Sequence, residues 1–473
     1  MDRKKLWIGG QWIEAKKYVQ LRSPYSGEVI AEIPSADLEE TEAAIAAAYE
    51  ARASMAALHA HERATILERL ALAIEKRSDE AARLLAFEAA KPFTTAKAEV
   101  ARTVQTYKFA AEEAKRIHGE TIPLDAAPGG ENKLAYTVRE PIGVVGAITP
   151  FNFPLNLVAH KVGPAIAAGN TIVLKPASQT PLSAYLIAEL LDEAGLPSGA
   201  LNIVTGSGSV VGNRIVEDNR VSMITFTGSP EVGIGIRSRA GLKRVTLELG
   251  SNSALLIDRG VDIDGIINRC VTGAFSNQGQ VCISLQRIYT HEDVYDRFTA
   301  KFAEAAGRLK QGDPLDPATE LSALISEGDT ARAMEWIDEA REAGATVVTG
   351  GTVQNGIVAP TVITNAYAEL KVSCQEVFAP IAVINKVSTM EEAFELVNNS
   401  RYGLQAGIYT ENLRTALDAA GKLHVGGVMI NDIPTFRVDH MPYGGVKESG
   451  IGREGIKYAV EEMTELKLVV INR

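Results

Sequence analysis

Hydrophobic positions recur at helical spacing over residues 37–118, the first strongly patterned part of the chain. Apolar side chains fall three or four positions apart through Ala43–Ala57, Ala64–Ile74 and Ala81–Ala90, with charged residues between them. This period places the apolar side chains on one face of an α-helix. Pro92 stands where one helix should end and the next begin, because proline disrupts a helix interior.

Short apolar runs alternate with helical stretches from residue 143 to residue 249. The predicted strands are Gly143–Ile148, Thr171–Leu174, Leu201–Val204, Met223–Thr227 and Val245–Leu249, and the helices between them include Val158–Ala168 and Leu182–Glu193. Strands that alternate with helices are typical of a parallel sheet with right-handed crossovers. This part of the sequence therefore predicts an α/β fold.

A second alternating block runs from about residue 253 to residue 430. Its predicted strands are Ala254–Ile257, Ile288–Thr290, Thr346–Thr349 and Ile381–Lys386. Residues 119–138, rich in proline and glycine, are expected to be extended. A helix around Glu454–Glu462 precedes a lone strand, Glu465–Val470. A lone terminal strand needs a partner sheet, and a neighbouring subunit is one source of it.

The size and charge of the chain restrict the classes of protein it can be. Because 473 residues exceed what one core usually holds, two or three domains are expected. A formal net charge of −11 and the lack of a dense basic run argue against nucleic acid as a partner. No apolar run is long enough to span a membrane, and the first residues do not resemble a signal peptide. We expect a cytoplasmic protein.

Cysteine and histidine usage gives no sign of a metal site. The three cysteines, Cys270, Cys282 and Cys374, are too widely spaced for a disulfide framework or a CxxC site. The seven histidines show no ligand-like spacing such as HxxxH. No metal is therefore expected.

Several polar residues stand where chemistry is often placed, although each also has a simpler interpretation. Cys282 follows a glycine-containing turn, but a lone cysteine is commonly buried and inert. Glu248 ends an apolar run, where a carboxylate can equally be a solvated strand end. Asn152 lies between two prolines, which also suits an Asx-type turn. Phe226–Ser229 follows a strand and opens a helix, which suits phosphate binding at a helix N-terminus.

Taken together and in order, these segments resemble the aldehyde dehydrogenase superfamily over essentially the whole chain. The segments that carry the resemblance are Pro150–Pro154, Leu174–Pro176, Phe226–Ser229, Glu248–Gly250, Gly279–Cys282, Gln375–Pro380, Pro442–Lys447 and Ser449–Glu454. The resemblance implies an α/β fold built from a Rossmann-like cofactor domain (1–118 and 141–249), a catalytic domain (250–440) and a small β oligomerisation domain (119–140 and 458–473). It also implies a homodimer or homotetramer.

The resemblance assigns catalysis to three residues. Cys282 matches the nucleophile that attacks the aldehyde and then carries a thiohemiacetal and a thioester. Its site should favour the thiolate, since a free thiol has a pKa near ~8.5. The Asn152 amide, with the Cys282 backbone N–H, matches the donors to the oxyanion. Glu248 matches the general base that activates water against the thioester, which requires partial desolvation of its carboxylate.

A nicotinamide cofactor, NAD or NADP, follows from the same resemblance. The matching cofactor positions are Pro150, Phe151, Lys175, Ser178, Gly228, Ser229, Glu376 and Phe378. Among them, Lys175 and Glu376 match positions that hold ribose hydroxyls, and Ser229 matches a pyrophosphate contact. Strongly NAD-preferring relatives carry glutamate at the position of Ser178, where it would repel a 2′-phosphate. We therefore expect NADP to be accepted; the alternative is a neutral variation in an NAD enzyme.

The residues expected around the substrate are polar. Relatives that act on apolar aldehydes carry aromatic side chains at the positions of His160 and Arg437. A cation in a pocket is costly unless it meets an anion, and a guanidinium suits a carboxylate, phosphate or sulfonate. Arg102 could add a further positive group. The alternatives are a salt bridge of Arg437 to Asp432 or Asp439, packing for His160, and a solvated helix face for Arg102.

The segment Asn431–Pro442 resembles one branch of the family, the lactaldehyde and non-phosphorylating glyceraldehyde-3-phosphate dehydrogenases. The expected substrate is a short hydroxylated or anionic aldehyde, such as lactaldehyde, glyceraldehyde-3-phosphate or sulfolactaldehyde. Tyr443, directly after this segment's last residue, is another candidate pocket residue. The run Lys175–Gln179 also occurs in succinate-semialdehyde dehydrogenases, which makes that substrate the alternative.

Two other functions compete with this one. Dehydrogenases that pass the thioester to coenzyme A generally lack the glutamate matching Glu248. A non-enzymatic protein that kept the fold should have lost Cys282, Glu248 or Asn152. One departure from the family pattern is Ser251, where a second glycine usually follows Gly250. Serine tolerates fewer backbone conformations than glycine, so the loop near the nicotinamide can differ.

Overall fold

The helical pattern at the start of the chain forms four consecutive helices. They are α1 (Leu38–Ala57), α2 (Ala60–Lys76), α3 (Ser78–Ala89) and α4 (Phe93–Ala114). Asp37 begins α1 with a capping box, in which its carboxylate accepts hydrogen bonds from the N–H groups of Glu39 and Glu40. Pro92 stands directly before α4, as predicted. The computed structural model describes residues 2–473, so Met1, the first residue of the predicted cofactor domain, lies outside the described residues.

An eight-stranded sheet forms the centre of the first half, in the order β2-β1-β9-β8-β7-β10-β11-β23. Its strands are β1 (Leu6–Ile8), β2 (Gln11–Ile13), β7 (Val144–Ile148), β8 (Thr171–Lys175), β9 (Leu201–Ile203), β10 (Val221–Thr227), β11 (Arg244–Glu248) and β23 (Gly450–Ile451), with helices α5 (Asn156–Ala168), α6 (Leu182–Ala194), α7 (Asn213–Glu217) and α8 (Pro230–Arg239) between them. Strands β7 to β11 run parallel, which confirms the predicted α/β fold.

A seven-stranded sheet forms the second half, in the order β14-β17-β18-β13-β12-β20-β21. Its strands are β12 (Ala254–Ile257), β13 (Arg287–His291), β14 (Thr346–Thr349), β17 (Thr361–Thr364), β18 (Ile381–Val387), β20 (Gln405–Tyr409) and β21 (Gly427–Ile430), and its helices are α9 (Ile263–Phe275), α10 (Glu292–Gly307), α11 (Glu327–Glu342), α12 (Lys371–Cys374), α13 (Met390–Asn398) and α14 (Leu413–Lys422). All its strands are parallel except β14, which runs antiparallel to β17.

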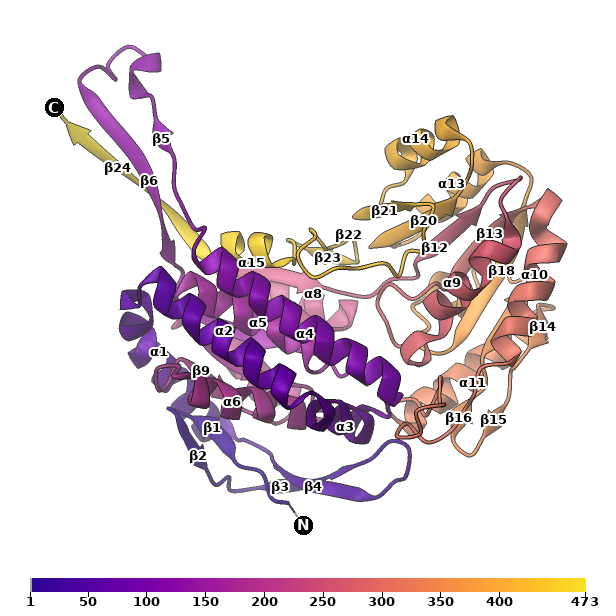
Figure 1. Cartoon of the computed structure of the whole chain (residues 1–473), viewed down its shortest axis with the longest axis horizontal. Coiled ribbons are helices and arrows are strands. Elements are labelled where there is room, and N and C mark those ends of the chain that lie inside the picture. The colour runs from indigo at the N-terminus through magenta and orange to yellow at the C-terminus, as the bar shows by residue number, and fades with distance from the viewer. Residues whose placement is uncertain (1) are drawn as a thin grey trace.

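The terminal strand is not a lone strand, because its partner lies in the same chain. After α15 (Ile456–Glu462), strand β24 (Thr464–Asn472) pairs along its whole length with β6 (Lys133–Pro141), which in turn pairs with β5 (Thr121–Ile122). The sequence interpretation had considered a neighbouring subunit as one source of the strand that pairs with it. These three strands project from the rest of the molecule as an arm that ends at the C-terminus (Figure 1).

Three short strand pairs complete the fold, and the sequence did not predict them. They are β3 (Tyr18–Arg22) with β4 (Val29–Pro34), β15 (Val353–Gln354) with β16 (Ile357–Val358), and β19 (Tyr402–Gly403) with β22 (Val446–Lys447). The two halves of the molecule face each other, with α4 and α5 on one side and α9 on the other (Figure 1). No helix of residues 2–473 has the length and apolar character of a membrane span.

Candidate active site

A cavity of about 720 Å³ is lined by residues from both halves of the molecule. Most of the predicted site residues line it: Arg102, Pro150, Phe151, Asn152, Gly228, Ser229, Cys282, Glu376, Phe378, Arg437 and Tyr443. The others, Lys175, Ser178, His160 and Glu248, are not part of its wall. Of these four, Lys175, His160 and Glu248 are buried. Residues far apart in the sequence thus meet around one space.

The turn before Cys282 has an unusual backbone. Asn277, Gln278 and Gly279 adopt successive left-handed conformations, with φ of 52°, 58° and 71°. A Cβ atom on Gly279 would lie 2.2 Å from the carbonyl oxygen of Ala379, so only glycine fits there. Strained backbone of this kind is often concentrated at functional sites. The turn ends at the edge of the cavity and presents the thiol of Cys282 to it.

The thiol of Cys282 lies 2.8 Å from the hydroxyl of Tyr443. Burial raises the pKa of Cys282 to about 11, against the opposing effects of the Tyr443 hydrogen bond and the Arg437 guanidinium. The sequence interpretation expected a site that favours the thiolate. Burial outweighs the two groups that stabilise the anion, so the site favours the protonated thiol over the thiolate.

The Asn152 side chain reaches the loop that carries Cys282. Its amide nitrogen donates to the carbonyl of Gln280 at 2.9 Å, which uses one of its two N–H groups. Lys91 donates to the carbonyl of Asn152 at 2.7 Å and forms a buried ion pair with Glu99. Glu99 also accepts hydrogen bonds from the N–H groups at the start of α5, which fixes the loop that carries Asn152.

Glu248 ends β11 in a buried position, and within residues 2–473 neither of its carboxylate oxygens has a hydrogen-bond partner. Burial, followed by the charge of Glu454, raises its pKa well above the ordinary value, while Arg437 and Lys161 oppose the shift. Because the oxygens are unpartnered and desolvated, this carboxylate is a stronger base than one in water.

The loop after Glu248 approaches Glu376 closely. A Cβ atom on Gly250 would lie 2.7 Å from a carboxylate oxygen of Glu376, and the N–H of Ser251 donates to the other oxygen at 3.0 Å. Ser251 has no left-handed backbone, and its hydroxyl pairs with that of Ser253 at 3.1 Å. Serine is therefore accommodated without strain at this departure from the family pattern. Burial raises the pKa of Glu376 to about 7.

Two further cofactor candidates lie at the end of β8. The ammonium group of Lys175 is buried and contacts one carbonyl, that of Pro176, at 3.1 Å. Burial lowers its pKa to about 8, and two of its donors stay free for hydroxyl groups. Ser178 donates to the carbonyl of Gly206 at 3.2 Å. No carboxylate stands at the position of Ser178, so a 2′-phosphate would meet no negative side chain there.

Ser229 caps the N-terminus of α8, where its hydroxyl accepts a hydrogen bond from the N–H of Val232. A helix N-terminus favours phosphate groups. Gly228 precedes it, and the rings of Phe151 and Phe378 meet edge to face with centroids 5.7 Å apart. The wall offers an anion-favouring helix end, aromatic rings and the half-buried carboxylate of Glu376, and the ammonium of Lys175 lies outside it. This set of groups fits a nicotinamide dinucleotide.

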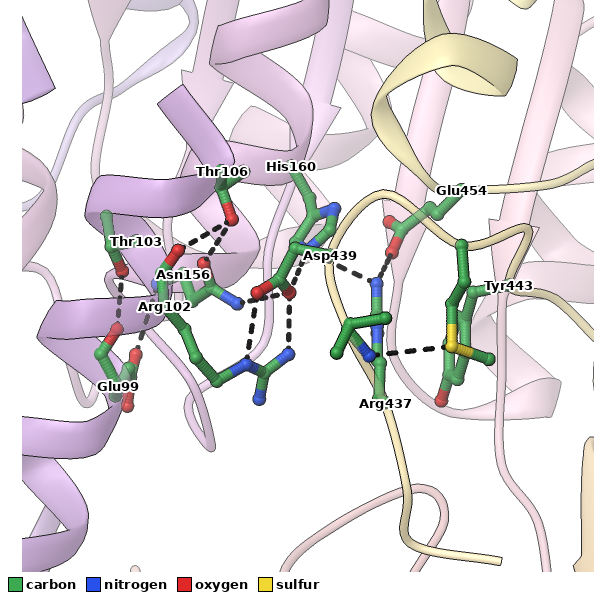
Figure 2. Close-up of polar contacts among 12 residues, drawn as sticks. Glu99, Arg102, Thr103, Thr106, Asn156, His160, Arg437, Asp439, Tyr443 and Glu454 are labelled. Atoms are coloured by element: carbon green, nitrogen blue, oxygen red, sulfur yellow. Dashed lines mark hydrogen bonds and ion pairs between the residues drawn. The ribbon is translucent and has the colours of Figure 1, made fainter. Parts of the chain in front are cut away.

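Arg437 pairs with a different carboxylate from those considered in the sequence. Its guanidinium donates to Glu454 at 3.0 Å and stacks on the ring of Tyr443, with its carbon 3.6 Å from the ring centroid (Figure 2). Lys161 donates to the other oxygen of Glu454 at 3.1 Å. Although burial opposes it, these cations and His160 lower the pKa of Glu454 to about 2.

Asp439 is the centre of the neighbouring contacts. Arg102 forms two hydrogen bonds to its carboxylate, at 2.6 and 3.2 Å, and His160 contacts it at 2.8 Å (Figure 2). His160 is therefore buried behind the cavity wall, whereas Arg102 lines it. Burial and the charge of Arg437 lower the pKa of His160, so its ring is neutral at pH 7.

The sequence interpretation missed four charged residues of this region: Lys91, Glu99, Lys161 and Arg269. Lys161 gave a signal, since a lysine within the apolar stretch Val158–Ala168 requires a buried partner. Arg269 lines the cavity and pairs with Asp432 at 2.8 Å. Within residues 2–473, no group of three or more His, Cys, Asp and Glu side chains is arranged to hold a metal ion.

The family model of the aldehyde dehydrogenases matches residues 12–469. The chain belongs to the aldehyde dehydrogenase family. It is an oxidoreductase that acts on an aldehyde with NAD(P) as cofactor, as its resemblance had implied.

Two relatives of this aldehyde dehydrogenase carry substrate names. A 3-sulfolactaldehyde dehydrogenase of Priestia megaterium is 44% identical, with 99% of this chain and 98% of the relative covered. A lactaldehyde dehydrogenase of Methanococcus aeolicus is 42% identical, with 99% and 100% covered. Lactaldehyde dehydrogenase belongs to the branch predicted from residues 431–442, and sulfolactaldehyde is among the substrates expected for it.

Two solved structures share the fold. Aldehyde dehydrogenase 21 from Physcomitrella patens, in complex with the reaction product succinate, has a TM-score of 0.97 and 40% identity, with 100% of this chain and 98% of that chain covered. The glyceraldehyde-3-phosphate dehydrogenase GapN from Methanocaldococcus jannaschii, complexed with NADP, has a TM-score of 0.93 and 39% identity, with 97% and 100% covered.

Proposed function

We propose that Cys282 is the nucleophile of this aldehyde dehydrogenase and that Asn152 and the Cys282 backbone N–H hold the oxyanion of the thiohemiacetal. The observation that carries this proposal is that Cys282 and Asn152 line the same cavity, with the Asn152 amide donating to the carbonyl of Gln280, two residues before Cys282. Such preorganised donors typically contribute ~10²–10³ in rate.

Glu248 is the base of this mechanism. Cys282 attacks the aldehyde as the thiolate, and Glu248 acts after that step, at the thioester. Glu248 lies close enough for its charge to influence Cys282 and has a raised pKa. Bound NAD(P) supplies the hydride acceptor. Glu248 then activates the water that hydrolyses the thioester on Cys282.

The cofactor is proposed to be held by Lys175 and Glu376 at its ribose hydroxyls and by Ser229 at its pyrophosphate, with Gly228, Pro150, Phe151 and Phe378 around it. NADP is proposed to be at least as good as NAD. The absence of a carboxylate at Ser178 supports this proposal, because a glutamate there would repel the 2′-phosphate.

The proposed substrate is a short hydroxylated or anionic aldehyde. Arg102, Arg269 and Arg437 are among the residues that line the cavity, and the phenol of Tyr443 adds a polar group. Each arginine pairs with one carboxylate, which leaves other N–H groups of its guanidinium for a ligand. His160 acts indirectly, by holding Asp439. The substrates named for the relatives support this class.

Initial rates of cofactor reduction test this proposal, with NAD and with NADP, over lactaldehyde, glyceraldehyde-3-phosphate, sulfolactaldehyde, succinate semialdehyde and hexanal. We expect the hydroxylated or anionic aldehydes to have the highest kcat/KM. Arg437→Leu should lower the ratio of their kcat/KM to that of hexanal at least tenfold. The exposed arginine variant Arg308→Gln is the control. A preference for hexanal in the wild type would refute the substrate assignment while leaving the chemistry intact.

Succinate semialdehyde is a second candidate substrate, because aldehyde dehydrogenase 21, with its product succinate, is 40% identical. The same panel separates it from the three-carbon aldehydes by relative kcat/KM. Transfer of the acyl group to coenzyme A is disfavoured by the presence of Glu248, and a burst of coenzyme A thioester in the product mixture would reverse that conclusion.

The domain roles and the assembly are proposals as well. We assign cofactor binding to residues 1–118 and 141–249, catalysis to 250–440, and oligomerisation to the arm segments 119–140 and 458–473. A homodimer or homotetramer is supported by the exposed apolar side chains of the arm, among them Leu466, Leu468 and Val470. We also propose a cytoplasmic location, supported by three unpaired cysteines.

A further inference from the structure

A second cavity, of about 880 Å³, lies in the catalytic half of the molecule and takes no part in the chemistry above. Its wall carries four cationic side chains: Arg287, Lys386, Arg401 and Lys447. None of its lining residues is an aspartate or a glutamate, and many are asparagine, glutamine or serine. A concave surface of this kind concentrates positive potential.

Three of these four cations have no carboxylate partner within the described chain. Arg287 is buried, with 7% of its surface exposed, and donates to the carbonyls of Asn252 at 2.8 Å and Leu396 at 3.2 Å. Lys447 donates to the carbonyl of Asn398 at 2.8 Å. Burial and the nearby Arg287 guanidinium lower the pKa of Lys447.

Of the four cations, Arg287 is buried, whereas Lys386, Arg401 and Lys447 are exposed. Lys386 lies over the ring of Tyr295, 5.4 Å from its centroid. Arg401 pairs with Glu448, its Nε 2.6 Å from the carboxylate. Four cations with one carboxylate partner leave a net positive charge at this wall, and the charge of the buried Arg287 is costly without an anion. The hydroxyl of Ser373, also buried at this wall, has no hydrogen-bond partner among residues 2–473.

We propose that this second cavity binds a multivalent oxyanion, a small molecule that carries phosphoryl groups or several carboxylates. Such a ligand neutralises several of the cations at once and accepts hydrogen bonds from the amides and the hydroxyl of the wall. The cavity is large enough for a small metabolite rather than for a single ion.

The same cavity lies against the loop that carries Glu376. Ser373 and Gln375 line it, and Gln375 also lines the active-site cavity. Arg401 donates to the side chain of Gln375 at 3.3 Å, and Asn252 donates to the carbonyl of Ser373 at 2.9 Å. An anion held by Arg401 therefore alters the contacts of the residue next to Glu376, so occupancy changes the affinity for the cofactor.

Titration calorimetry with inorganic pyrophosphate tests the site, on the full chain saturated with NADP and at constant ionic strength. Saturation with NADP keeps the probe out of the cofactor's own pyrophosphate position. We expect binding by the wild type, and a Kd at least tenfold higher for the double variant Lys386→Gln/Arg401→Gln. The matched control, Arg308→Gln/Lys457→Gln, removes the same charge elsewhere and should change the Kd by less than twofold.

No heat of binding with the wild type, or equal weakening in both double variants, would overturn the site. The coupling has its own readout, the KM for NADP with and without pyrophosphate. A shift in the wild type that disappears in Lys386→Gln/Arg401→Gln supports the coupling, and an unchanged KM in the wild type overturns it. Neither result depends on which aldehyde is the substrate.

Discussion

At the scale of single residues, the thiol of Cys282 gives the most direct prediction. Desolvation raises the pKa of this partly exposed thiol to about 11. The rate of alkylation by iodoacetamide should therefore rise about tenfold per pH unit from pH 7 to pH 10, as the thiolate fraction grows. Tyr443→Phe removes a hydrogen bond that stabilises the thiolate and should slow the reaction severalfold at any one pH.

Mass spectrometry of the alkylated peptides measures this rate at each pH. Cys374, which is also partly exposed, is the internal reference. A rate for Cys282 that is already constant below pH 8 would show that the site stabilises the thiolate without cofactor, contrary to this expectation.

Glu248→Gln should separate the two halves of the reaction. Without a base for water, the steady-state rate should fall by ~10²–10⁴, whereas a burst of reduced cofactor close to the enzyme concentration remains. Stopped-flow absorbance of the reduced nicotinamide measures both. Glu376→Gln serves as the comparison and should raise the KM for the cofactor instead. Loss of the burst together with the steady state would place Glu248 in the attack of the thiol rather than in hydrolysis alone.

The sequence predicted the residues of short motifs better than their partners. Cys282, Glu248 and Asn152 could be proposed because each lies in a local pattern, and the patterns occur in the family's order. The pairing of Arg102 with Asp439 joins residues 337 positions apart. Such contacts depend on how two halves of the molecule pack, and no local pattern encodes them. The pKa of Cys282 was also beyond the sequence, because it depends on burial.

At the scale of secondary-structure elements, the start of α5 depends on a buried ion pair. Glu99→Gln leaves the ammonium of Lys91 buried without a counter-charge, so the free energy of unfolding should fall by ~3–5 kcal/mol. The double variant Lys91→Met/Glu99→Leu should lose less. Urea unfolding followed by circular dichroism measures both, and Lys97→Met, in an exposed pair on the same helix, should have little effect.

A loss as small for Glu99→Gln as for Lys97→Met would contradict this assignment. The same loop carries Asn152, so Glu99→Gln should also lower kcat in the fraction that stays folded.

Nine strands of the two large sheets, β7 to β14 and β18, followed from their apolar runs, and every strand predicted in the first block is present to within two residues. The other strands of these sheets, β1, β2, β17, β20, β21 and β23, were not predicted. Parallel strands covered by helices on both faces carry continuous apolar sequence, which is a clear signal. The pairs β15–β16 and β19–β22 have only two residues in each strand, too few for any period. Their pairing is decided by the surrounding loops.

At the scale of the whole molecule, the arm should control assembly. Leu468 lies on β24 with 55% of its surface exposed. Leu468→Glu should weaken the association of subunits and shift the protein toward the monomer, because a charge on a buried interface is costly. Size-exclusion chromatography with light scattering measures the mass. Leu413→Glu, at a residue that is 74% exposed on α14, is the control.

An unchanged mass for Leu468→Glu, or an equal change for both variants, would exclude the arm as the main contact. The strand that forms it could be predicted from the sequence, whereas its pairing with β6 could not. That pairing joins segments more than three hundred residues apart, with no turn between them to fix the register.

Arg437 stands at the cavity wall, yet its charge also moderates the pKa of both Cys282 and Glu248. The same guanidinium thus affects both the choice of substrate and the reactivity of Cys282 and Glu248. Directed evolution toward apolar aldehydes that replaces this arginine alone should pass through variants with low rates. In those variants the pKa values of the nucleophile Cys282 and the base Glu248 would both rise. A productive route would introduce a new cation near Glu248 first, and only then exchange the arginine.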